Sequence, residues 1–501
     1  METRTAFWTA LTRFERNKIL PDIAIRNTVG FIGAVVLGTV FGSPSTGVVT
    51  GIGALNVSFS DSRDPYILRA RRMSLAALMC GIAVTAGSLS GHSNILAVIV
   101  AGLWAFSAGM MVALGSPAGD LGVTTLVTVV VFAARPQPPL IAIESGLNAM
   151  AGAFLQILLS IAPWPWRRYE PEKRIVNSLY RALAGMARSP GVPSSAPPLT
   201  GQISDAREAL GSLTSDHGLE AERLVFLLNQ AERIRLSILT LGRLSRRLAR
   251  APEGAEAAAA LTHVLETAAD ALDGRLDAFT HAARQFRKRN WNFDSKFVRA
   301  LIRDAIQQVD ALGGQIRAAT GTVPAAYDPQ EAREPWRLRF TGRLARLEAN
   351  LSLDSTVFRH ALRLALCLGI GDAAGRALSL QRTYWIPMTI AIVLKPEFTA
   401  TFTRGFLRIA GTLAGLLLAT VLFRFVHTGS ATDIVLMGVF FFLLRWVGPA
   451  NYGVFVTALS AMVVLLIATT GVSPGEVIAA RAINTVIGGA IAMAAYALWP
   501  T

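Results

Sequence analysis

The sequence predicts an all-α polytopic membrane protein in which two parallel six-helix transmembrane repeats flank a central cytoplasmic helical domain. Apolar stretches recur from about residue 23 to 161 and from about 357 to 498, whereas residues 167–346 are densely charged. The chain of 501 residues is 52% hydrophobic and only 16% charged. A soluble protein of this length mixes apolar and charged residues throughout, so their segregation indicates membrane insertion.

Twelve apolar segments are interpreted as bilayer spans, six before the charged region and six after it. A helix needs roughly 20 predominantly apolar residues to cross the hydrocarbon core, and the shorter segments approach this length with their neighbours. The first six lie near residues 26–42, 47–59, 73–89, 94–114, 119–133 and 140–161. The last six lie near residues 358–377, 384–394, 406–425, 433–446, 452–470 and 476–498.

Four domains follow from this pattern. We expect an amphipathic interfacial segment at residues 1–22, a first repeat at 23–166, a cytoplasmic helical domain at 167–350 and a second repeat at 351–501. The N-terminal segment mixes aromatic and basic residues, which is typical of a helix lying on the inner membrane face. It lacks the pattern of a cleavable signal peptide.

The two repeats share a sequence pattern in their sixth spans. An asparagine precedes a glycine by four residues at Asn148 and Gly152, and again at Asn484 and Gly488. In both repeats the second span is followed by a polar segment with a proline and several basic residues. Because six spans return the chain to its starting side, the repeats are expected to be parallel.

Positive charge sets the expected orientation. Arg72 in the first repeat, and Lys395 and Arg404 in the second, follow the second spans, on the side of the N-terminus and the central domain. The opposite loops are short and mostly uncharged. Since cytoplasmic loops are enriched in Lys and Arg, both termini and the central domain are expected in the cytoplasm. The same rule accounts for the net charge of +15, and no sequence signature of nucleic-acid binding accompanies it.

The central domain is expected to be a bundle of four or five helices. Residues 219–250, 255–289 and 295–318 place apolar residues at helical spacing, and residues 189–200 form a Pro/Ser-rich linker. The basic run at 285–292 has two interpretations, a phosphate or lipid head-group site and a solvated helix end.

The motifs of common enzymes are missing from the sequence, so catalysis is not expected. The six histidines are scattered, without a His-Glu-x-x-His motif, and no Cys-x-x-Cys, Walker loop or Gly-x-Ser-x-Gly motif occurs. We therefore expect no metal, no cofactor and no nucleic-acid partner. Without a nucleotide site of the Walker type, transport would not be powered by ATP hydrolysis in this chain.

Polar side chains inside the predicted spans are the candidate functional residues, because they are costly to bury in a bilayer. Arginine exceeds acid in the second repeat. A guanidinium stays charged and offers bidentate hydrogen bonds to a carboxylate, so an arginine-lined path suits an anionic solute, aromatic ones included. The substrate-binding candidates are Arg382, Tyr384, Trp385, Arg376, Arg408, Arg481, Asn484 and Asn148.

Carboxyl and basic side chains near the spans have other expected roles. Asp372 and Glu144 are candidates for proton coupling, because a carboxyl group held away from water can carry protons. Lys395, Arg404 and Arg72 are expected at the cytoplasmic end, as a gate or as anchors at the lipid head groups.

Some of the arginines have an alternative, structural interpretation. Arg408 also fits a head-group anchor. For the arginines at positions 376, 382 and 481, the alternative is a buried ion pair with Asp372 or Glu476.

One stretch of the second repeat carries a family resemblance. It reads RTYWIPMTIAIVLKP from Arg382 to Pro396 and is followed by Arg404 and by RIAGTLAG from Arg408. This stretch resembles the fusaric acid resistance / aromatic acid exporter family, whose members show a Tyr-Trp-x-Pro-Leu-Thr span, a proline at its end and an Arg-x-x-Gly-Thr-x-x-Gly helix. Met388 replaces the usual leucine, and the first repeat lacks the Tyr-Trp-Pro cluster.

The resemblance implies a bacterial inner-membrane protein that exports aromatic or other organic acids, often beside a periplasmic adaptor and an outer-membrane channel. The layout is also similar to that of plant aluminium-activated malate transporters, whose six-span subunits pair to form an anion pathway. By this analogy the chain is a single-chain pseudo-dimer, with a homodimer as the alternative. Analogy at the level of the fold identifies no substrate.

Three functions follow as hypotheses. The first is a transporter that exports organic anions, above all aromatic carboxylic acids, between two six-helix halves and is driven by protons or the membrane potential. The second is a passive organic-anion channel, and the third is a membrane scaffold or lipid-interacting protein without transport.

Overall fold

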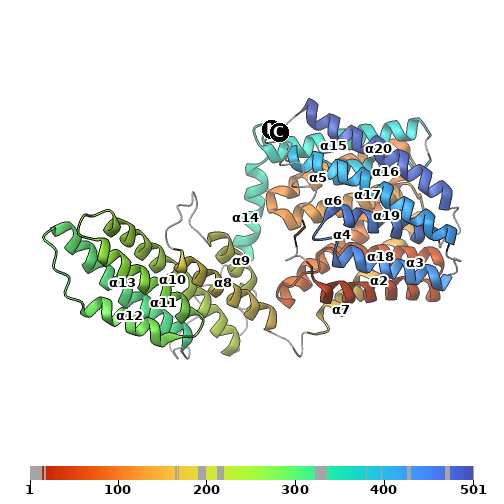
Figure 1. Cartoon of the computed structure of the whole chain (residues 1–501). Coiled ribbons are helices and arrows are strands. Elements are labelled where there is room, and N and C mark those ends of the chain that lie inside the picture. The colour runs from red at the N-terminus through yellow and green to blue at the C-terminus, as the bar shows by residue number, and fades with distance from the viewer. Residues whose placement is uncertain are drawn as a thin grey trace. The chain divides into compact units, whose positions relative to one another are not determined.

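The chain divides into two compact units, which the computed structural model shows as helices throughout its described part (Figure 1). The membrane unit comprises Met1–Ser62, Arg69–Pro163 and Pro335–Thr501, and the polar unit comprises Arg63–Leu68 and Trp164–Glu334. The structure describes residues 14–15, 19–163, 166, 169–189, 199–211, 219–321, 336–379, 381–396, 398–425, 430–468 and 474–499. Most of the predicted interfacial segment at 1–22, and residues 190–198 of the predicted linker, lie outside these ranges.

The first helix set of the membrane unit runs from α2 to α7. Its helices are α2 (Pro21–Phe41), α3 (Pro44–Ser58), α4 (Tyr66–Ser90), α5 (Asn94–Met110), α6 (Ser116–Ala133) and α7 (Pro139–Ile161), with the short 3-10 helix η2 (Met111–Leu114) before α6. Prolines lie in the first turns of four of these helices. Their missing N–H costs no hydrogen bond there, because the N–H groups of a first turn have no acceptor within the helix. The observed helices match the six predicted spans to within a few residues at most ends.

The second helix set runs from α15 to α20, after α14 (Trp336–Ala349). Its helices are α15 (Thr356–Ala377), α16 (Trp385–Val393), α17 (Phe398–Phe425), α18 (Ser430–Trp446), α19 (Tyr452–Ala468) and α20 (Pro474–Leu498). The Ser355 hydroxyl caps α15 by accepting from the Phe358 N–H. α17 begins eight residues before the predicted span, because its helix continues through a Thr/Arg-containing turn that hydropathy alone leaves out.

Seven helices of the described residues are long and apolar enough to cross a membrane. They are Pro21–Phe41, Tyr66–Ser90, Asn94–Leu114, Ser116–Ala133, Pro139–Ile161, Thr401–Phe425 and Gly475–Leu498. The predicted polytopic helical membrane protein is confirmed at this level. The others in the two sets are shorter or more polar, and α16 has only nine residues.

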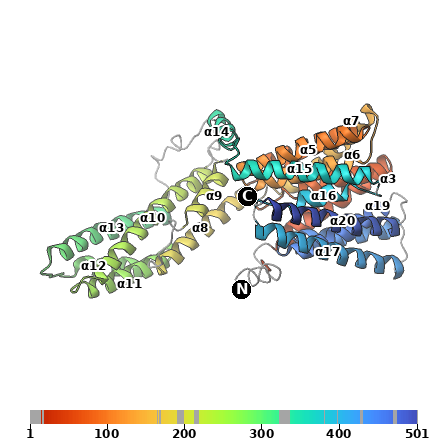
Figure 2. The same ribbon diagram turned by 90° about the horizontal axis from the view of Figure 1, so that it is seen from above.

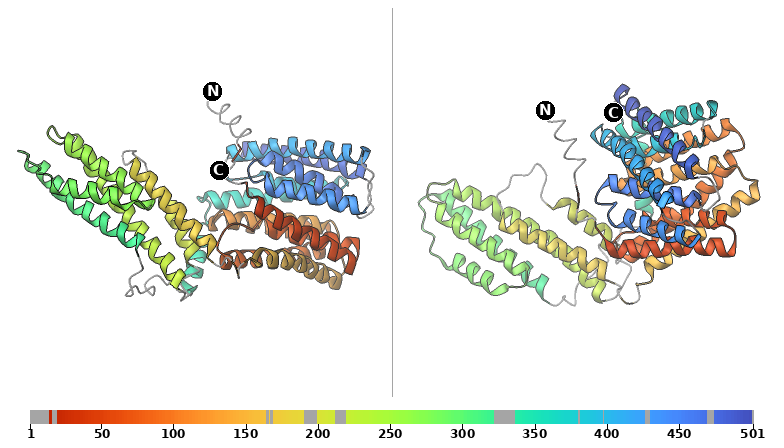
Figure 3. Two further views of the ribbon diagram at one scale, coloured as in Figure 1. Left: turned by 60° about the horizontal axis from the view of Figure 1, so that its bottom comes forward. Right: turned by 45° about the vertical axis from the view of Figure 1, so that its right-hand side comes forward.

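The two helix sets contact each other through several helix pairs. α5 packs along α15, α18 packs along α2, and α6 packs against α16. Phe31 of α2 stacks on Phe441 of α18, with ring centroids 4.3 Å apart. Val127 and Val131 of α6 belong to the same apolar cluster as Trp385 of α16. The helices of the membrane unit lie side by side in the turned views (Figures 2 and 3).

Glycines allow close helix crossings within each set. A side chain at Gly53 of α3 would overlap the Ala149 carbonyl of α7. In the second set, a Cβ at Gly488 of α20 would lie 2.6 Å from the Ile386 carbonyl oxygen of α16. These two crossings hold α3 on α7 and α16 on α20.

The polar unit contains six helices in its described part, where four or five were expected. They are α8 (Glu170–Arg188), α9 (Thr200–Leu210), α10 (Leu219–Ala249), α11 (Ala255–Leu272), α12 (Leu276–Lys288) and α13 (Lys296–Thr320). The region 255–289, whose apolar residues have helical spacing, forms two helices that are separated at Gly274, whose φ of 98° leaves the helical region. Leu183, Ile234, Leu261 and Leu312 lie in the apolar core of the unit.

Candidate functional site

Three arginines are fully buried in the second helix set without a carboxylate partner among the described residues. One of them, Arg363 of α15, donates to the backbone carbonyl oxygens of Trp499 and Lys395, over 2.6 and 3.4 Å. The other two form the candidate site. Arg408 of α17 and Arg481 of α20 are each 1% exposed. Neither forms an ion pair with any residue that the structure describes. The Nε and Nη1 atoms of both guanidinium groups also lack hydrogen-bond partners in the described part of the chain. The two groups are close enough to repel each other, so the site carries uncompensated positive charge.

Arg481 contacts an aromatic side chain and a hydroxyl group. Its guanidinium carbon lies 5.1 Å from the ring centroid of Trp385, and its Nη2 donates to the Ser460 hydroxyl over 3.3 Å. Tyr384 packs edge-on against Trp385, with ring centroids 5.2 Å apart. Four of the predicted binding residues, Arg408 among them, therefore lie at one place in the structure.

The chain before α16 is held by an asparagine from α20. Asn484 Nδ2 donates to the Gln381 carbonyl oxygen over 2.8 Å and to the Arg382 carbonyl oxygen over 3.1 Å. Arg382 has a φ of 54°, a left-handed conformation that is strained for an arginine. Asn484 thus fixes the turn that leads into Tyr384 and Trp385. A positioning contribution of Asn484 to the site follows directly from these contacts.

Hydroxyl groups without partners lie on the same helices. Thr389 of α16 and Thr412 of α17 are buried, and their Oγ1 atoms find no hydrogen bond among the described residues. Buried polar groups normally have partners. Unsatisfied donors on α16, α17 and α20 together indicate a place where a polar ligand or water binds.

The alternative interpretation as a buried ion pair is correct for Arg376 but not for Arg481. Arg376 Nε donates to Asp372 Oδ1 over 3.1 Å, and its Nη1 donates to Asn94 Oδ1 of α5 over 3.1 Å. Arg376 therefore forms an ion pair within α15 and ties this helix to α5 through the hydrogen bond to Asn94. Glu476 is exposed and makes no such pair with Arg481. Asp372 is buried, and its carboxylate is paired with Arg376, four residues later on the same helix.

The other predicted residues lie elsewhere in the membrane unit. Glu144 is exposed on α7, and Asn148 is half-buried one turn further on. Lys395 Nζ lies 3.9 Å from Asp120 Oδ1, and its backbone N–H donates to the Thr401 hydroxyl.

Of the two remaining basic candidates, Arg404 lies one helical turn before Arg408 on α17, and Arg72 lies in the first helix set. Arg404 of α17 lies over the ring of Tyr452, 5.0 Å from its centroid. Arg72 is half-buried on α4. Their predicted role as a gate or as anchors stays a prediction.

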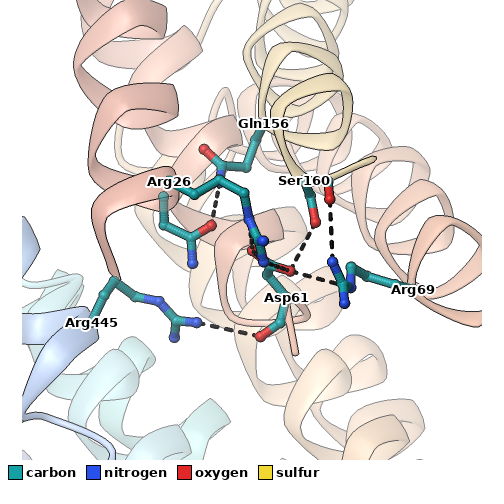
Figure 4. Close-up of polar contacts among 7 residues, drawn as sticks. Arg26, Asp61, Arg69, Gln156, Ser160 and Arg445 are labelled. Carbon is teal, nitrogen blue, oxygen red and sulfur yellow. Dashed lines mark hydrogen bonds and ion pairs between the residues drawn. The ribbon is translucent and has the colours of Figure 1, made fainter. Parts of the chain in front are cut away.

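A second polar network surrounds Asp61, just after α3 (Figure 4). The Asp61 carboxylate accepts two hydrogen bonds from Arg26 Nη2, at 2.7 and 2.8 Å, and one from the Ser160 hydroxyl at 2.8 Å. Arg69 Nε lies 3.7 Å from the same carboxylate. The Asp61 backbone carbonyl accepts from Arg445 Nη2 of α18 over 3.5 Å. This network joins α18 of the second set to α2, α4 and α7 of the first.

Two buried amides complete the network around Asp61. With its amide group oriented to satisfy its neighbours, Asn27 donates to Asp61 Oδ2 over 2.8 Å and accepts from Arg445 Nε over 3.1 Å. Gln156 of α7 lies against Asn27. This network was not predicted from the sequence. Asn27 and Gln156, amides inside apolar helices, were the signal that could have revealed it.

The comparisons with known proteins concern mainly the second helix set. A family model described as Fusaric acid resistance protein-like matches residues 366–495. The chain is 37% identical over 158 residues to the Inner membrane protein YccS of Escherichia coli, an alignment that covers 31% of this chain and 22% of YccS. It is 23% identical over 471 residues to the Uncharacterized membrane protein YvaC of Bacillus subtilis, covering 92% of this chain and 69% of YvaC.

A further relative matches over a similarly short stretch. The Uncharacterized protein YhfK of Escherichia coli is 32% identical over 162 residues, which cover 31% of this chain and 22% of YhfK. The chain thus covers about a fifth of the length of YccS and YhfK. No solved structure is significantly similar to it. The region that matches the Fusaric acid resistance protein-like model, residues 366–495, thus contains both Arg408 and Arg481.

Proposed function

We propose that this membrane protein is an inner-membrane transporter that exports organic anions, with aromatic carboxylic acids as the substrate class. The observation that carries the proposal is the pair of buried arginines at positions 408 and 481, which lack a carboxylate among the described residues. Isolated buried charges are costly, so their presence inside the bilayer points to a ligand that neutralises them. A carboxylate accepts the bidentate hydrogen bonds that a guanidinium offers.

The neighbouring side chains favour a substrate with a ring. Trp385 and Tyr384 place two aromatic surfaces beside Arg481. Aromatic pairs gain energy from stacked and edge-on arrangements beyond the apolar area that they bury. A benzoate-like anion can place its carboxylate on the arginines and its ring beside these side chains. The unsatisfied hydroxyl of Thr389 offers a further hydrogen bond in the same region.

The twelve membrane helices are proposed to form two parallel six-helix repeats. Matching helix contacts support this arrangement: α3 packs on α7 as α16 packs on α20, and α2 on α3 as α15 on α16. The contacts between the sets match as well, since α5 packs on α15 and α18 on α2. Under this proposal the transport pathway runs between the two halves, beside α6 and α16, with both termini and the polar unit in the cytoplasm.

Under this proposal, apolar side chains packed between α6 and α16 close the pathway in the present structure. Val127 and Val131 of the first set share one apolar cluster with Trp385, which covers Arg481. Access to the arginines therefore requires α6 and α16 to separate. The Asp61 network would restrain such a movement, because Arg445 connects the second set to the first.

A passive anion channel is the second candidate, and one observation favours it. The two carboxyl groups suggested for proton coupling are poorly placed, since Asp372 is paired with Arg376 and Glu144 is exposed. Neither contacts the buried arginines. Anion movement driven by the membrane potential, without a coupled proton, is consistent with this arrangement.

Efflux from reconstituted vesicles tests the proposal. The full-length protein is reconstituted into liposomes loaded with radiolabelled benzoate, and efflux is followed with an imposed pH gradient, with an imposed potential and with neither. We expect wild-type efflux that Arg481→Met and Arg408→Met abolish. Arg424→Gln, at an exposed arginine near the end of α17, is the matched control and should keep full efflux. Equal efflux from wild-type and Arg481→Met vesicles would overturn the proposal, and dependence on the pH gradient separates the carrier from the channel.

A further inference from the structure

The polar unit contains an open groove between α11 and α12, with a cavity volume of about 850 Å³. Both helices line it at i, i+3, i+4 and i+7 spacing, through Glu256, Ala259, Ala260 and His263 on α11 and His281, Arg284, Gln285 and Lys288 on α12. Residues at this spacing share one helix face. The first part of the basic run at 285–292 therefore forms part of the wall of this groove.

The shape of the groove follows from the difference between its two walls. The α11 wall is built on short side chains, Ala259 and Ala260, which leave space above the helix backbone. The α12 wall carries long basic side chains, and Ala282 lies at its base. Phe286 is buried in the core of the unit and fixes α12 in place. The result is an apolar floor under a cationic edge.

The ion pairs in this region leave two of the cations free. Arg287 does not line the groove, and its Nη1 lies 3.6 Å from Asp310 Oδ1 of α13, whereas Arg289 pairs with Glu256. Arg284 and Lys288, between these pairs, form no ion pair with any residue that the structure describes. They lie one helical turn apart, about 6 Å along the axis. A row of two unpaired cations at this separation suits two linked phosphates.

We propose that this groove binds a nucleoside polyphosphate. The phosphates lie on Arg284 and Lys288, because guanidinium and ammonium groups are the preferred protein partners of phosphate. The uncharged part of the ligand lies over Ala259 and Ala260, and the Gln285 amide offers both a donor and an acceptor to a base. This ligand site is separate from the anion site of the membrane unit and involves binding only.

Glu256 gives the proposal a distinctive consequence. Its carboxylate pairs with Arg289 at the edge of the groove and repels an incoming phosphate. Replacing it with glutamine removes this repulsion and frees Arg289 to contact the ligand. Glu256→Gln should therefore bind the ligand more tightly than the wild type, which a purely structural role of these residues does not predict.

The test is isothermal titration of ATP into the full-length protein in nanodiscs of neutral lipid. We expect saturable binding that Arg284→Ala and Lys288→Ala each weaken about tenfold, the loss of one charge-assisted contact. Glu256→Gln should tighten it severalfold. The matched control is Arg233→Ala, at an exposed arginine of α10 outside the groove. Circular dichroism of each variant confirms that the helices are retained.

Three results would overturn the proposal. One is the absence of saturable ATP binding to the wild type. Another is an equal loss in Arg233→Ala, which would mean that ATP responds only to the general positive charge of the unit. The third is ATP binding that is unchanged in both Arg284→Ala and Lys288→Ala, which would place the bound ATP outside the groove.

Discussion

Replacing Arg481 with methionine should abolish transport while leaving the protein about as stable as the wild type or more stable. Methionine has a similar length and no charge, so it fills most of the same buried space. The side chain is 1% exposed, and its hydrogen bond to the Ser460 hydroxyl is long, at 3.3 Å. Two of its three nitrogens have no partner in the described part of the chain.

The magnitude follows from opposing contributions. Removing the charge relieves a desolvation penalty of several kcal/mol for a single buried ion. Losing the cation–π contact with Trp385 costs about 2 kcal/mol, and losing the hydrogen bond to Ser460 costs about 1.5 kcal/mol. We therefore expect the free energy of unfolding to stay within about 1 kcal/mol of the wild type or to rise by up to about 4 kcal/mol.

Two measurements on the same purified variant check this prediction. Denaturant titration of the protein in detergent, followed by tryptophan fluorescence, gives the change in unfolding free energy. Benzoate efflux from liposomes gives transport. Arg376→Met is the matched control, because it breaks the ion pair with Asp372 and is expected to cost about 3 to 5 kcal/mol.

The reasoning would be refuted in either of two ways. A loss of more than about 3 kcal/mol in Arg481→Met, the cost of breaking a buried ion pair, would mean that the guanidinium is satisfied in the folded protein. Undiminished benzoate efflux would mean that the arginine is structural.

Further predictions concern stability. Asp61→Asn leaves the surrounding arginines without their carboxylate and should cost about 3 to 5 kcal/mol in denaturant titrations; unchanged stability would contradict the proposed linkage of the two helix sets. Gly53→Ala should cost about 1 to 3 kcal/mol through overlap with α7, whereas Gly102→Ala, with open space around it, should be neutral or gain about 0.5 kcal/mol. Burial raises the pKa of the Tyr180 phenol. Its contribution to the stability of the polar unit is therefore fully present below the unfolded pKa of about 10 and is lost as the pH rises above it. Tyr180→Phe should reduce this loss of stability at alkaline pH, and an unchanged pH profile of the unfolding free energy would exclude the effect.

Hydropathy was sufficient to predict the helical membrane class and most helix positions. α5 and α7 begin and end within a few residues of their predicted spans, because their apolar residues run uninterrupted between polar loops. α16 is harder to recognise, with nine residues, and its position depends on Asn484 of a distant helix. The break at Gly274 depends on a left-handed backbone conformation that an apolar pattern does not reveal.

The spacing of acidic and basic residues along a helix explains why one of the two suggested ion pairs forms and the other does not. Asp372 and Arg376 are four residues apart, so a helix places them on one face and the ion pair forms. Glu476 and Arg481 are five residues apart, and a helix turns them away from each other. Arginine inside an apolar helix was enough to identify Arg481 as a candidate. That it has no carboxylate partner could be learned only from the folded structure.

The Asp61 network shows what local sequence cannot supply. Asp61 and Arg445 are separated by 384 positions in the chain. Their contact depends on the packing of α18 against α2, which no periodicity within either helix predicts. Asn27 and Gln156 are recognisable as polar residues in apolar helices, but their common partner is not.

The central claim is that Arg408 and Arg481 bind a carboxylate. Calorimetric titration of benzoate into the full-length protein tests it most directly, with benzyl alcohol as the uncharged ligand of similar shape. We predict saturable benzoate binding that is lost in Arg408→Met and Arg481→Met, and no comparable binding of benzyl alcohol. Equal binding of the two ligands, or benzoate binding that survives both substitutions, would contradict the claim.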